Sequence, residues 1–288
     1  MQKRVLAVHD ISCVGRCSLT VALPILSAAG INTSIIPTAL LSTHTGEFTG
    51  YTHLDLSDQL LPIARHIATL GLAFDALYTG YLASSQQVRQ VLEIVDLLIG
   101  PQTHLFVDPA FADHGKLYSL LDDTMPSQMR RLCARAHTIV PNLTEAAFLL
   151  DEPYPGESYS PAYVSRLARS LCSMGPENVI ITDVSFDPKE TGIVMYQRGM
   201  GEPLFSFTKR YQGPFHGTGD VFASFLLGAL LRGKSLLSAV RLALSLTHDS
   251  ILVTLEEEQP LRYGVQFERM TPKFLQALGL QSPLESES

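Results

Sequence analysis

The chain has 288 residues, of which 46% are hydrophobic and 17% charged, and its formal net charge is -7. This composition is typical of a globular protein with a large core and excludes a disordered chain. The negative balance argues against non-specific nucleic-acid binding, which relies on a surplus of lysine and arginine. The few cysteines have no disulfide or zinc-site spacing. Without a signal-peptide pattern or an apolar run of membrane-spanning length, we expect a cytoplasmic protein with no membrane partner.

Apolar or β-branched runs of strand length alternate with helical patterns along most of the chain. Glycine and proline residues separate several of these segments. In chain order, strands are predicted at 5–8, 33–36, 76–78, 105–107, 138–140, 179–182 and 193–196, and helices at 18–29, 57–70, 85–99 and from 218 or 219 onward.

This alternation predicts βαβ units, and therefore an α/β fold whose mainly parallel sheet is covered by helices on both faces. In such sheets, ligands bind beyond the carboxyl ends of the strands. Functional side chains should therefore come just after the strand-like runs. Four candidates stand at such positions: Asp10, Tyr81, Asp108 and Asn142.

The stretch 151–161 is rich in proline and contains a glycine, which predicts a surface loop. A linker between two domains is the alternative for this stretch. Because the same alternation of strands and helices continues on both sides, we predict one domain over residues 1–288, with a polar tail at 281–288.

Residues 216–220, His-Gly-Thr-Gly-Asp, stand at the start of an apolar helical pattern. Free backbone N–H groups at a helix start, together with the helix dipole, stabilise the charge that develops on a transferring phosphoryl group. Gly217 and Gly219, on either side of Thr218, let this backbone approach closely. Asp220 is then placed to accept a proton from a substrate hydroxyl. The alternative is that Thr218 is only an N-cap and Asp220 only a favourable first-turn acid.

Acidic residues follow two other predicted strands. Asp108 comes directly after one strand with Asp113 close behind it, and Asn142 and Glu145 follow the next strand. Because Mg²⁺ keeps several waters and needs few direct carboxylates, these side chains predict a magnesium site. For Asn142 and Glu145 the alternative is a capping arrangement, and for Asp113 a solvated loop carboxylate. No P-loop or protein-kinase sequence set is present, which favours a site built from a helix start and scattered strand ends.

In combination, the segments 216–220, 108–109 and 141–145 resemble the ribokinase-like superfamily, and within it the pyridoxal (vitamin B6) kinases most closely. The resemblance extends from the first strand to Thr254. Three further segments are similar to the first ligand loop, the Ser-Asn-His-Thr-Gly segment and the Thr/Ser-Gly-Tyr-Leu segment of those kinases: 10–15, 42–46 and 79–82.

The resemblance implies a three-layer α/β/α sandwich and ATP-dependent phosphorylation of the 5′-hydroxymethyl group of pyridoxal, pyridoxine or pyridoxamine. Asp220 would be the general base, and the backbone of Gly217, Thr218 and Gly219 the anion hole. Tyr81 would stack on the pyridine ring. The implied substrate-binding residues are Asp10, Ser12, His44, Thr45 and Tyr81. The implied ATP-binding residues are Asp108, Asn142, Glu145, Thr182, Thr218 and Gly219.

The same resemblance implies Mg²⁺ as the cofactor, held by Asp108, Asp113 and Glu145, with a monovalent cation such as K⁺ as a further candidate. It also implies a homodimer. The other partners are then small molecules, the B6 vitamer and ATP.

Alternatives stay open for the function. A hydroxymethylpyrimidine kinase shares His-Gly-Thr-Gly but typically continues with Cys where Asp220 stands. Another small-alcohol kinase, or a catalytically idle protein that binds the cofactor or a partner, is also compatible with the pattern. The B6 kinases usually have Ser where Asp10 stands, and an acid there would favour a cationic aminomethyl group, as in pyridoxamine.

Overall fold

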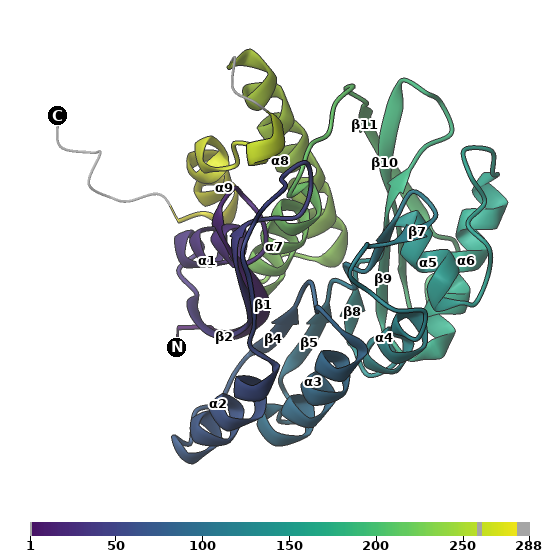
Figure 1. Cartoon of the computed structure of the whole chain (residues 1–288). Coiled ribbons are helices and arrows are strands. Elements are labelled where there is room, and N and C mark those ends of the chain that lie inside the picture. Colours follow the sequence, from purple (N-terminus) through teal and green to yellow (C-terminus); the bar gives the residue numbers. More distant parts are fainter. Residues whose placement is uncertain (1, 258–260, 281–288) are drawn as a thin grey trace, which may run out of the picture.

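A nine-stranded sheet forms the middle layer of the molecule in the computed structural model, which describes residues 2–257 and 261–280 (Figure 1). The strands lie in the order β11-β10-β9-β8-β5-β4-β1-β2-β3. Their bounds are β1 (Arg4–Val14), β2 (Asn32–Thr43), β3 (His53–Asp55), β4 (Ala76–Thr79), β5 (His104–Val107), β8 (Thr138–Ile139), β9 (Asn178–Val184), β10 (Glu190–Gln197) and β11 (Leu204–Lys209). A separate hairpin consists of β6 (Ala112–Asp113) and β7 (Lys116–Leu117).

The six strands from β2 through β1, β4, β5 and β8 to β9 pair in parallel. At the two edges, β3 pairs antiparallel with β2, and β10 and β11 continue antiparallel from β9. Parallel neighbours need a crossover connection that returns the chain to the same end of the sheet, and helices fill most of these crossovers. The predicted mainly parallel sheet is confirmed.

Helices cover both faces of this sheet (Figure 1). One face carries α1 (Leu19–Ala28), α7 (Thr218–Leu231), α8 (Leu236–Glu256) and α9 (Thr271–Leu278). The other face carries α2 (Ser57–Thr69), α3 (Ser85–Leu98), α4 (Met125–Cys133), α5 (Leu143–Leu149) and α6 (Pro161–Met174). Two short 3-10 helices lie between α8 and α9 in the chain, η1 (Leu261–Tyr263) and η2 (Glu268–Met270). The three-layer α/β/α architecture is therefore confirmed.

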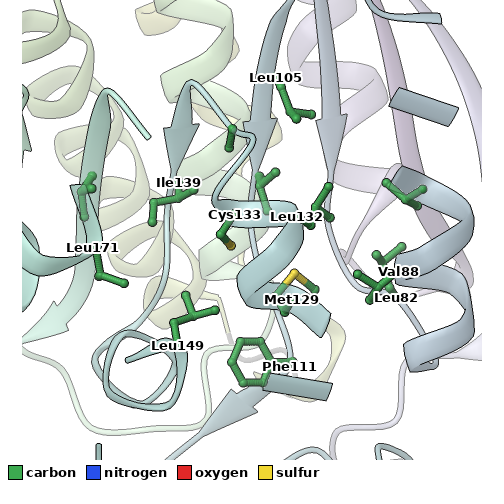
Figure 2. Packing of buried hydrophobic residues seen from close by; sticks show 14 of the residues in the cluster. Leu82, Val88, Leu105, Phe111, Met129, Leu132, Cys133, Ile139, Leu149 and Leu171 are labelled. Carbon is green, nitrogen blue, oxygen red and sulfur yellow. The ribbon is translucent and has the colours of Figure 1, made fainter. Parts of the chain in front are cut away.

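Two hydrophobic clusters, one on each face of the sheet, hold the layers together. Along β5, Leu105 and Val107 join the cluster under α2 to α6, while Phe106 joins the cluster under α1, α7, α8 and α9. Figure 2 shows the first cluster around α4, with Met129 and Cys133 directed into it. Burying a large apolar side chain contributes about 1.5–3 kcal/mol to the stability of the fold. The clusters on both faces therefore stabilise the sheet and keep the ends of its strands in place.

The first strand is longer than its apolar run predicts. The run 5–8 covers only the part of β1 between the two clusters, whereas β1 extends to Val14 and stays paired with β2, with a register shift between His9 and Ile11. Asp10 therefore lies within β1, and the prediction that it follows the strand is wrong. The physical reason is that backbone pairing satisfies N–H and C=O groups whether or not the side chains are apolar.

The segment 151–160 consists of turns and irregular chain, as predicted. The next helix, α6, begins where Ser160 accepts a hydrogen bond from the Tyr163 N–H at 3.2 Å, with Pro161 in the first turn. The same sheet takes β8 before this segment and β9 after it. The single domain stays a prediction, and the predicted tail at 281–288 lies outside the described residues.

Within residues 2–257 and 261–280, α8 alone is long and apolar enough to cross a membrane by length and composition. Its buried residues Ala239, Val240 and Leu246 belong to the cluster that α8 shares with α7. Its partly buried Asp249 pairs with Lys273 of α9. These contacts are those of a core helix of the α/β/α sandwich.

Candidate active site

The path of the chain through the sheet reverses at β1. From β1 the chain moves to β2 and β3 on one side, and later to β4, β5, β8 and β9 on the other. In open α/β sheets, the crevice beyond the carboxyl ends of the strands at such a point binds ligands. Three candidates follow strands here as predicted: Tyr81 after β4, Asp108 after β5 and Asn142 after β8.

The start of α7 needs glycine at its N-cap. Gly217 has a φ of 74°, and a Cβ there would lie 2.0 Å from the backbone oxygen of Arg16. At Gly219 a Cβ would meet nothing within 4 Å, so the space in front of this residue is open. The Thr218 hydroxyl donates to the Phe215 carbonyl oxygen at 3.2 Å, so the capping role considered for Thr218 is wrong. Open backbone N–H groups at this helix start can hold an anion.

Asp220 in the first turn of α7 is held by one backbone donor. The Ser18 N–H donates to its Oδ2 at 2.9 Å, and Ser18 has a φ of 55°, a conformation that is uncommon for residues other than glycine. Burial raises the pKa of Asp220 to about 7, the Ser18 hydrogen bond opposes this, and the charge of Asp10 raises it further. A carboxylate with a pKa near neutrality is suited to general-base catalysis.

Asp10 and Ser12 lie in the part of β1 beyond the hydrophobic clusters. Asp10 is 4% exposed, and its Oδ1 has no hydrogen-bond partner, nor has the buried hydroxyl of Ser12. Burial raises the pKa of Asp10 to about 6, against the effect of the nearby polar side chains of Ser18 and Ser12. Unpartnered buried polar atoms are costly, so these two oxygens within β1 are available to bind water or a ligand.

Tyr81 lies close to Asp10. Burial and then the charge of Asp10 raise the pKa of the Tyr81 hydroxyl to about 12. The Tyr81 ring is tilted by 43° to the ring of Tyr118, with 6.3 Å between centroids. Two aromatic rings at this spacing form an apolar wall that a flat ligand can contact.

His44 connects two loops near the start of α7. Its Nδ1 accepts from the Gly46 N–H at 3.2 Å, so Nε2 carries the proton and donates to the Arg262 carbonyl oxygen at 2.6 Å. Both ring nitrogens are thus engaged by backbone, and the predicted contact of His44 with a substrate stays a prediction. Thr45 beside it is exposed. A Cβ at Gly46 would lie 2.5 Å from the His216 ring, so this loop packs against the segment that leads into α7.

Asn142 and Glu145 form the capping box that was the alternative to an ATP site. Asn142 Oδ1 accepts from the Glu145 N–H and Glu145 Oε2 accepts from the Asn142 N–H, both at 2.9 Å. Glu145 Oε1 also accepts from the N–H groups of Phe111 at 2.7 Å and Ala112 at 3.3 Å. Burial raises the pKa of Glu145 to about 7 despite these donors. The carboxylate of Glu145 therefore ties the loop after β5 to the start of α5.

Asp108 and Asp113, the two acids after β5, both lie near Glu145. Burial, followed by the charges of Glu145 and Asp220, raises the pKa of Asp108 well above its usual range. Asp113 is less buried and accepts from the His114 N–H at 2.8 Å through Oδ1. Among the described residues, no three His, Cys, Asp or Glu side chains converge tightly enough to coordinate one ion directly. The crowding of negative charge fits a divalent cation held largely through water, as Mg²⁺ prefers.

Thr182 and Asp183 lie at the end of β9, next to the start of α5. The Thr182 N–H donates to the Pro141 carbonyl oxygen at 2.9 Å, which extends the pairing of β9 toward Asn142. Asp183 has a φ of 57° and forms an ion pair with Arg210 at 3.3 Å between Oδ1 and a guanidinium nitrogen. This pair brings a cation to the nucleotide side of the predicted site, and no sequence motif pointed to either residue.

Tyr118, after β7, is a second site residue that no sequence pattern indicates. Although the residue is 38% exposed, desolvation of its hydroxyl and then the charges of four acids raise the pKa of that hydroxyl well above its usual range; these acids are Glu145, Asp113, Asp108 and Asp220. Tyr118 also faces Tyr81, so it lies between the aromatic wall and the acidic cluster. It comes from a polar segment without periodicity, and only the β6–β7 hairpin brings it to the strand ends.

Residues 23–262 match the sequence family described as phosphomethylpyrimidine kinase. A Bacteroides thetaiotaomicron protein described by the same activity and crystallised with pyridoxal is 36% identical, with a TM-score of 0.90 over 95% of this chain and 96% of its own. Pyridoxal kinase from Lactobacillus plantarum is 29% identical, with a TM-score of 0.87 over 96% of this chain and 98% of its own. The pyridoxal kinase of Pasteurella multocida is 25% identical over 242 residues, 80% of this chain and 81% of its own. The predicted superfamily is confirmed: the chain belongs to the phosphomethylpyrimidine kinase family and shares the ribokinase-like fold of pyridoxal kinases.

Proposed function

We propose that this protein is a pyridoxal kinase, which transfers the γ-phosphate of ATP to the 5′-hydroxymethyl group of a B6 vitamer. The observation that carries the proposal is the start of α7, where Asp220 lies beside the open backbone of Gly219. The name of the Lactobacillus plantarum relative and the pyridoxal in the Bacteroides thetaiotaomicron structure support the choice of acceptor. A base and an anion hole within one helical turn are what transfer to a hydroxyl needs.

In the proposed reaction, Asp220 accepts the proton of the 5′-hydroxyl as its oxygen attacks the phosphorus. The N–H groups of Gly217, Thr218 and Gly219 stabilise the negative charge on the transferring group. The ring of the vitamer lies against Tyr81, while Asp10, Ser12 and Thr45 bind its polar substituents. The unpartnered oxygens of Asp10 and Ser12 support this assignment.

ATP is the proposed co-substrate, bound on the side of β5, β8 and β9. Asp108, Asp113 and Glu145 would hold Mg²⁺ largely through water, and Mg²⁺, when bound, neutralises phosphate charge. Because three backbone donors already occupy Glu145, it would act on Mg²⁺ only through water, while it also fixes the loop that leads to Asp113. Asn142 and Thr182 would position the phosphates through their place at adjacent strand ends.

A hydroxymethylpyrimidine kinase is the second candidate, because the matching family is described by a kinase that acts on a related pyrimidine. Both reactions phosphorylate a hydroxymethyl group on a flat nitrogen heterocycle, so the same base and anion hole would serve either. The residue that argues for the vitamer is Asp220, where hydroxymethylpyrimidine kinases typically have Cys.

The test is an ATP-dependent assay with pyridoxal, pyridoxine, pyridoxamine and hydroxymethylpyrimidine, using the parent protein and Asp220→Asn. We expect turnover of the vitamers by the parent and a large loss in the variant. Turnover of hydroxymethylpyrimidine alone would replace the proposal by the second candidate. Equal turnover by both proteins would remove Asp220 as the base.

A cytoplasmic location and a homodimer are also proposed, on the resemblance to B6 kinases alone. Sedimentation velocity at micromolar concentration tests the homodimer. A dimer of the 31.5 kDa chain would give a molar mass near twice that value. A single monomeric species across the concentration range would contradict it.

A further inference from the structure

Asp10 is a buried carboxylate without a strong cationic partner. It is 4% exposed and its Oδ1 accepts no hydrogen bond. Among the ion pairs of the described residues, none involves Asp10. A buried ionised carboxylate needs a partner to offset the loss of its hydration. We propose that Asp10 binds the protonated aminomethyl group of pyridoxamine, which makes this a site that selects the cationic vitamer.

The inference rests on the proposed B6 kinase function and names the preferred substrate within that class. Its first support is the place of Asp10 beside the base. Ser18 contacts both acids, through its N–H to Asp220 Oδ2 at 2.9 Å and through its side chain, which lowers the pKa of Asp10. The charge of Asp10 also acts on Asp220 and on Tyr81. Asp10 therefore borders both the reacting hydroxyl and the proposed ring platform.

Pyridoxamine has two nitrogens, one in the aminomethyl group and one in the ring. The positions of the ring substituents determine which of them lies near Asp10. The carbon that carries the aminomethyl group is the direct neighbour of the carbon that carries the reacting hydroxymethyl group. The ring nitrogen lies across the ring from the aminomethyl carbon. If the hydroxymethyl group lies at Asp220, the aminomethyl substituent lies nearer than the ring nitrogen to an acid beside Asp220.

A second observation that supports the proposal is the number of hydrogen-bond donors that the free oxygens near Asp10 can accept. Asp10 Oδ1 and Ser12 Oγ are both buried and unpartnered, and the Ser12 side chain is near enough to act on Asp10. An ammonium group offers three donors and a positive charge, so it can bind both oxygens. The hydroxymethyl group of pyridoxine offers one donor without charge, and the aldehyde of pyridoxal offers none. The order of preference is therefore pyridoxamine, then pyridoxine, then pyridoxal.

The test compares kcat/KM for the three vitamers in the parent, Asp10→Asn and Asp10→Ser. We expect both substitutions to lower kcat/KM for pyridoxamine by about 10- to 100-fold, mainly through KM, since a charge-assisted hydrogen bond is lost. The values for pyridoxine and pyridoxal should change by less than about 3-fold, because these vitamers bring no charge to Asp10.

Asp55→Asn is the matched control. Asp55 also raises the pKa of Tyr81, but its Oδ1 already accepts from the Ser57 N–H at 2.7 Å and from the Gln87 amide at 3.2 Å. This variant should keep the vitamer order of the parent. The affinity for ADP, which binds on the other side of the site, should be unchanged in all variants and reports on correct folding.

Equal losses for all three vitamers in the Asp10 variants, or no loss for pyridoxamine, would overturn the inference while leaving the kinase function intact. A parent protein that phosphorylates no vitamer would instead refute the proposed function. If neither Asp10 variant folds, the parent decides: tighter binding of pyridoxal than of pyridoxamine contradicts the inference, and the reverse order supports it.

Discussion

The two sides of the candidate site use their carboxylates differently. On the nucleotide side, Glu145 accepts hydrogen bonds from three backbone N–H groups. On the vitamer side, Asp220 accepts one from Ser18 and the Oδ1 of Asp10 accepts none. An ionised carboxylate has about four acceptor positions, so the vitamer side keeps most of its capacity free. In the proposed site, Glu145 is therefore satisfied by the fold, whereas Asp10 and Asp220 keep acceptor positions for a ligand.

The largest expected effect on the reaction rate comes from a substitution on the vitamer side. Asp220→Asn removes the proposed base while preserving size, so kcat should fall by about 10²–10⁴-fold, the range that general-base catalysis contributes. Because Asp220 accepts only one backbone hydrogen bond, the thermal midpoint should stay close to that of the parent. Steady-state kinetics and thermal unfolding of the same samples measure both. A collapse of the midpoint together with the rate would mean that Asp220 supports the fold and would contradict the comparison.

The two glycines at the start of α7 differ in what a side chain would meet. At Gly217 it would clash with the backbone, whereas at Gly219 it would enter the space proposed for a ligand. In Gly217→Ala the new methyl group would lie 2.0 Å from the Arg16 oxygen at a φ of 74°. Strain and overpacking should cost about 2–4 kcal/mol in the free energy of unfolding, measured by urea denaturation.

Gly219→Ala is the control for that substitution, because its methyl group meets nothing within 4 Å. Its stability should change by less than about 1 kcal/mol, with a small gain from helix propensity. Its kcat/KM for ATP should nevertheless fall, since the methyl group enters the space proposed for the phosphoryl group. Equal free energies of unfolding for Gly217→Ala and Gly219→Ala would show that the close approach to Arg16 does not destabilise the first variant.

On the nucleotide side, Glu145→Gln should act mainly on stability. A glutamine amide has one acceptor oxygen, so it cannot accept from both the Phe111 and the Asn142 N–H groups. Leaving one buried donor unpaired should cost about 1–3 kcal/mol in the free energy of unfolding, measured by urea denaturation. If stability is unchanged and the KM for ATP rises steeply, Glu145 binds the metal or nucleotide directly, and the proposed division between the two sides fails.

The sequence was sufficient for the features that depend on local patterns. Apolar runs and glycine positions predicted the parallel sheet, its two helical layers and the start of α7, and the spacing of Asn142 and Glu145 predicted the capping box as one of two options. Which option holds depends on Phe111 and Ala112, whose N–H groups come from a different loop. No sequence pattern encodes that contact.

The features that were not predictable depend on backbone geometry and long-range packing. The length of β1 follows from pairing with β2, so an apolar run alone places Asp10 wrongly. Ser18 reaches Asp220 through a positive φ across 202 positions of sequence separation. Tyr118 enters the site on the β6–β7 hairpin, whose strands are too short to leave a periodic signal.

The smallest expected effect is a shift in the pH dependence of the free enzyme. Burial raises the pKa of Asp220 to about 7, so kcat/KM should fall as the pH drops through this value and the base becomes protonated. The pKa of Asp10 is about 6, so Asp10 is largely ionised where Asp220 titrates, and its charge raises the pKa of Asp220. Asp10→Asn removes that charge, and the acid limb should therefore move to lower pH, by less than about one unit.

Pyridoxine is the substrate for this measurement, because its uncharged hydroxymethyl groups leave the comparison between parent and variant free of a lost ion pair. Asp55→Asn is the control, since Asp55 is not among the groups that set the pKa of Asp220. A limb that stays in place in Asp10→Asn would mean that the two acids do not interact. A limb that moves to lower pH while the maximal rate is kept would show that Asp10 and Asp220 interact and that Asp10 is not itself the base.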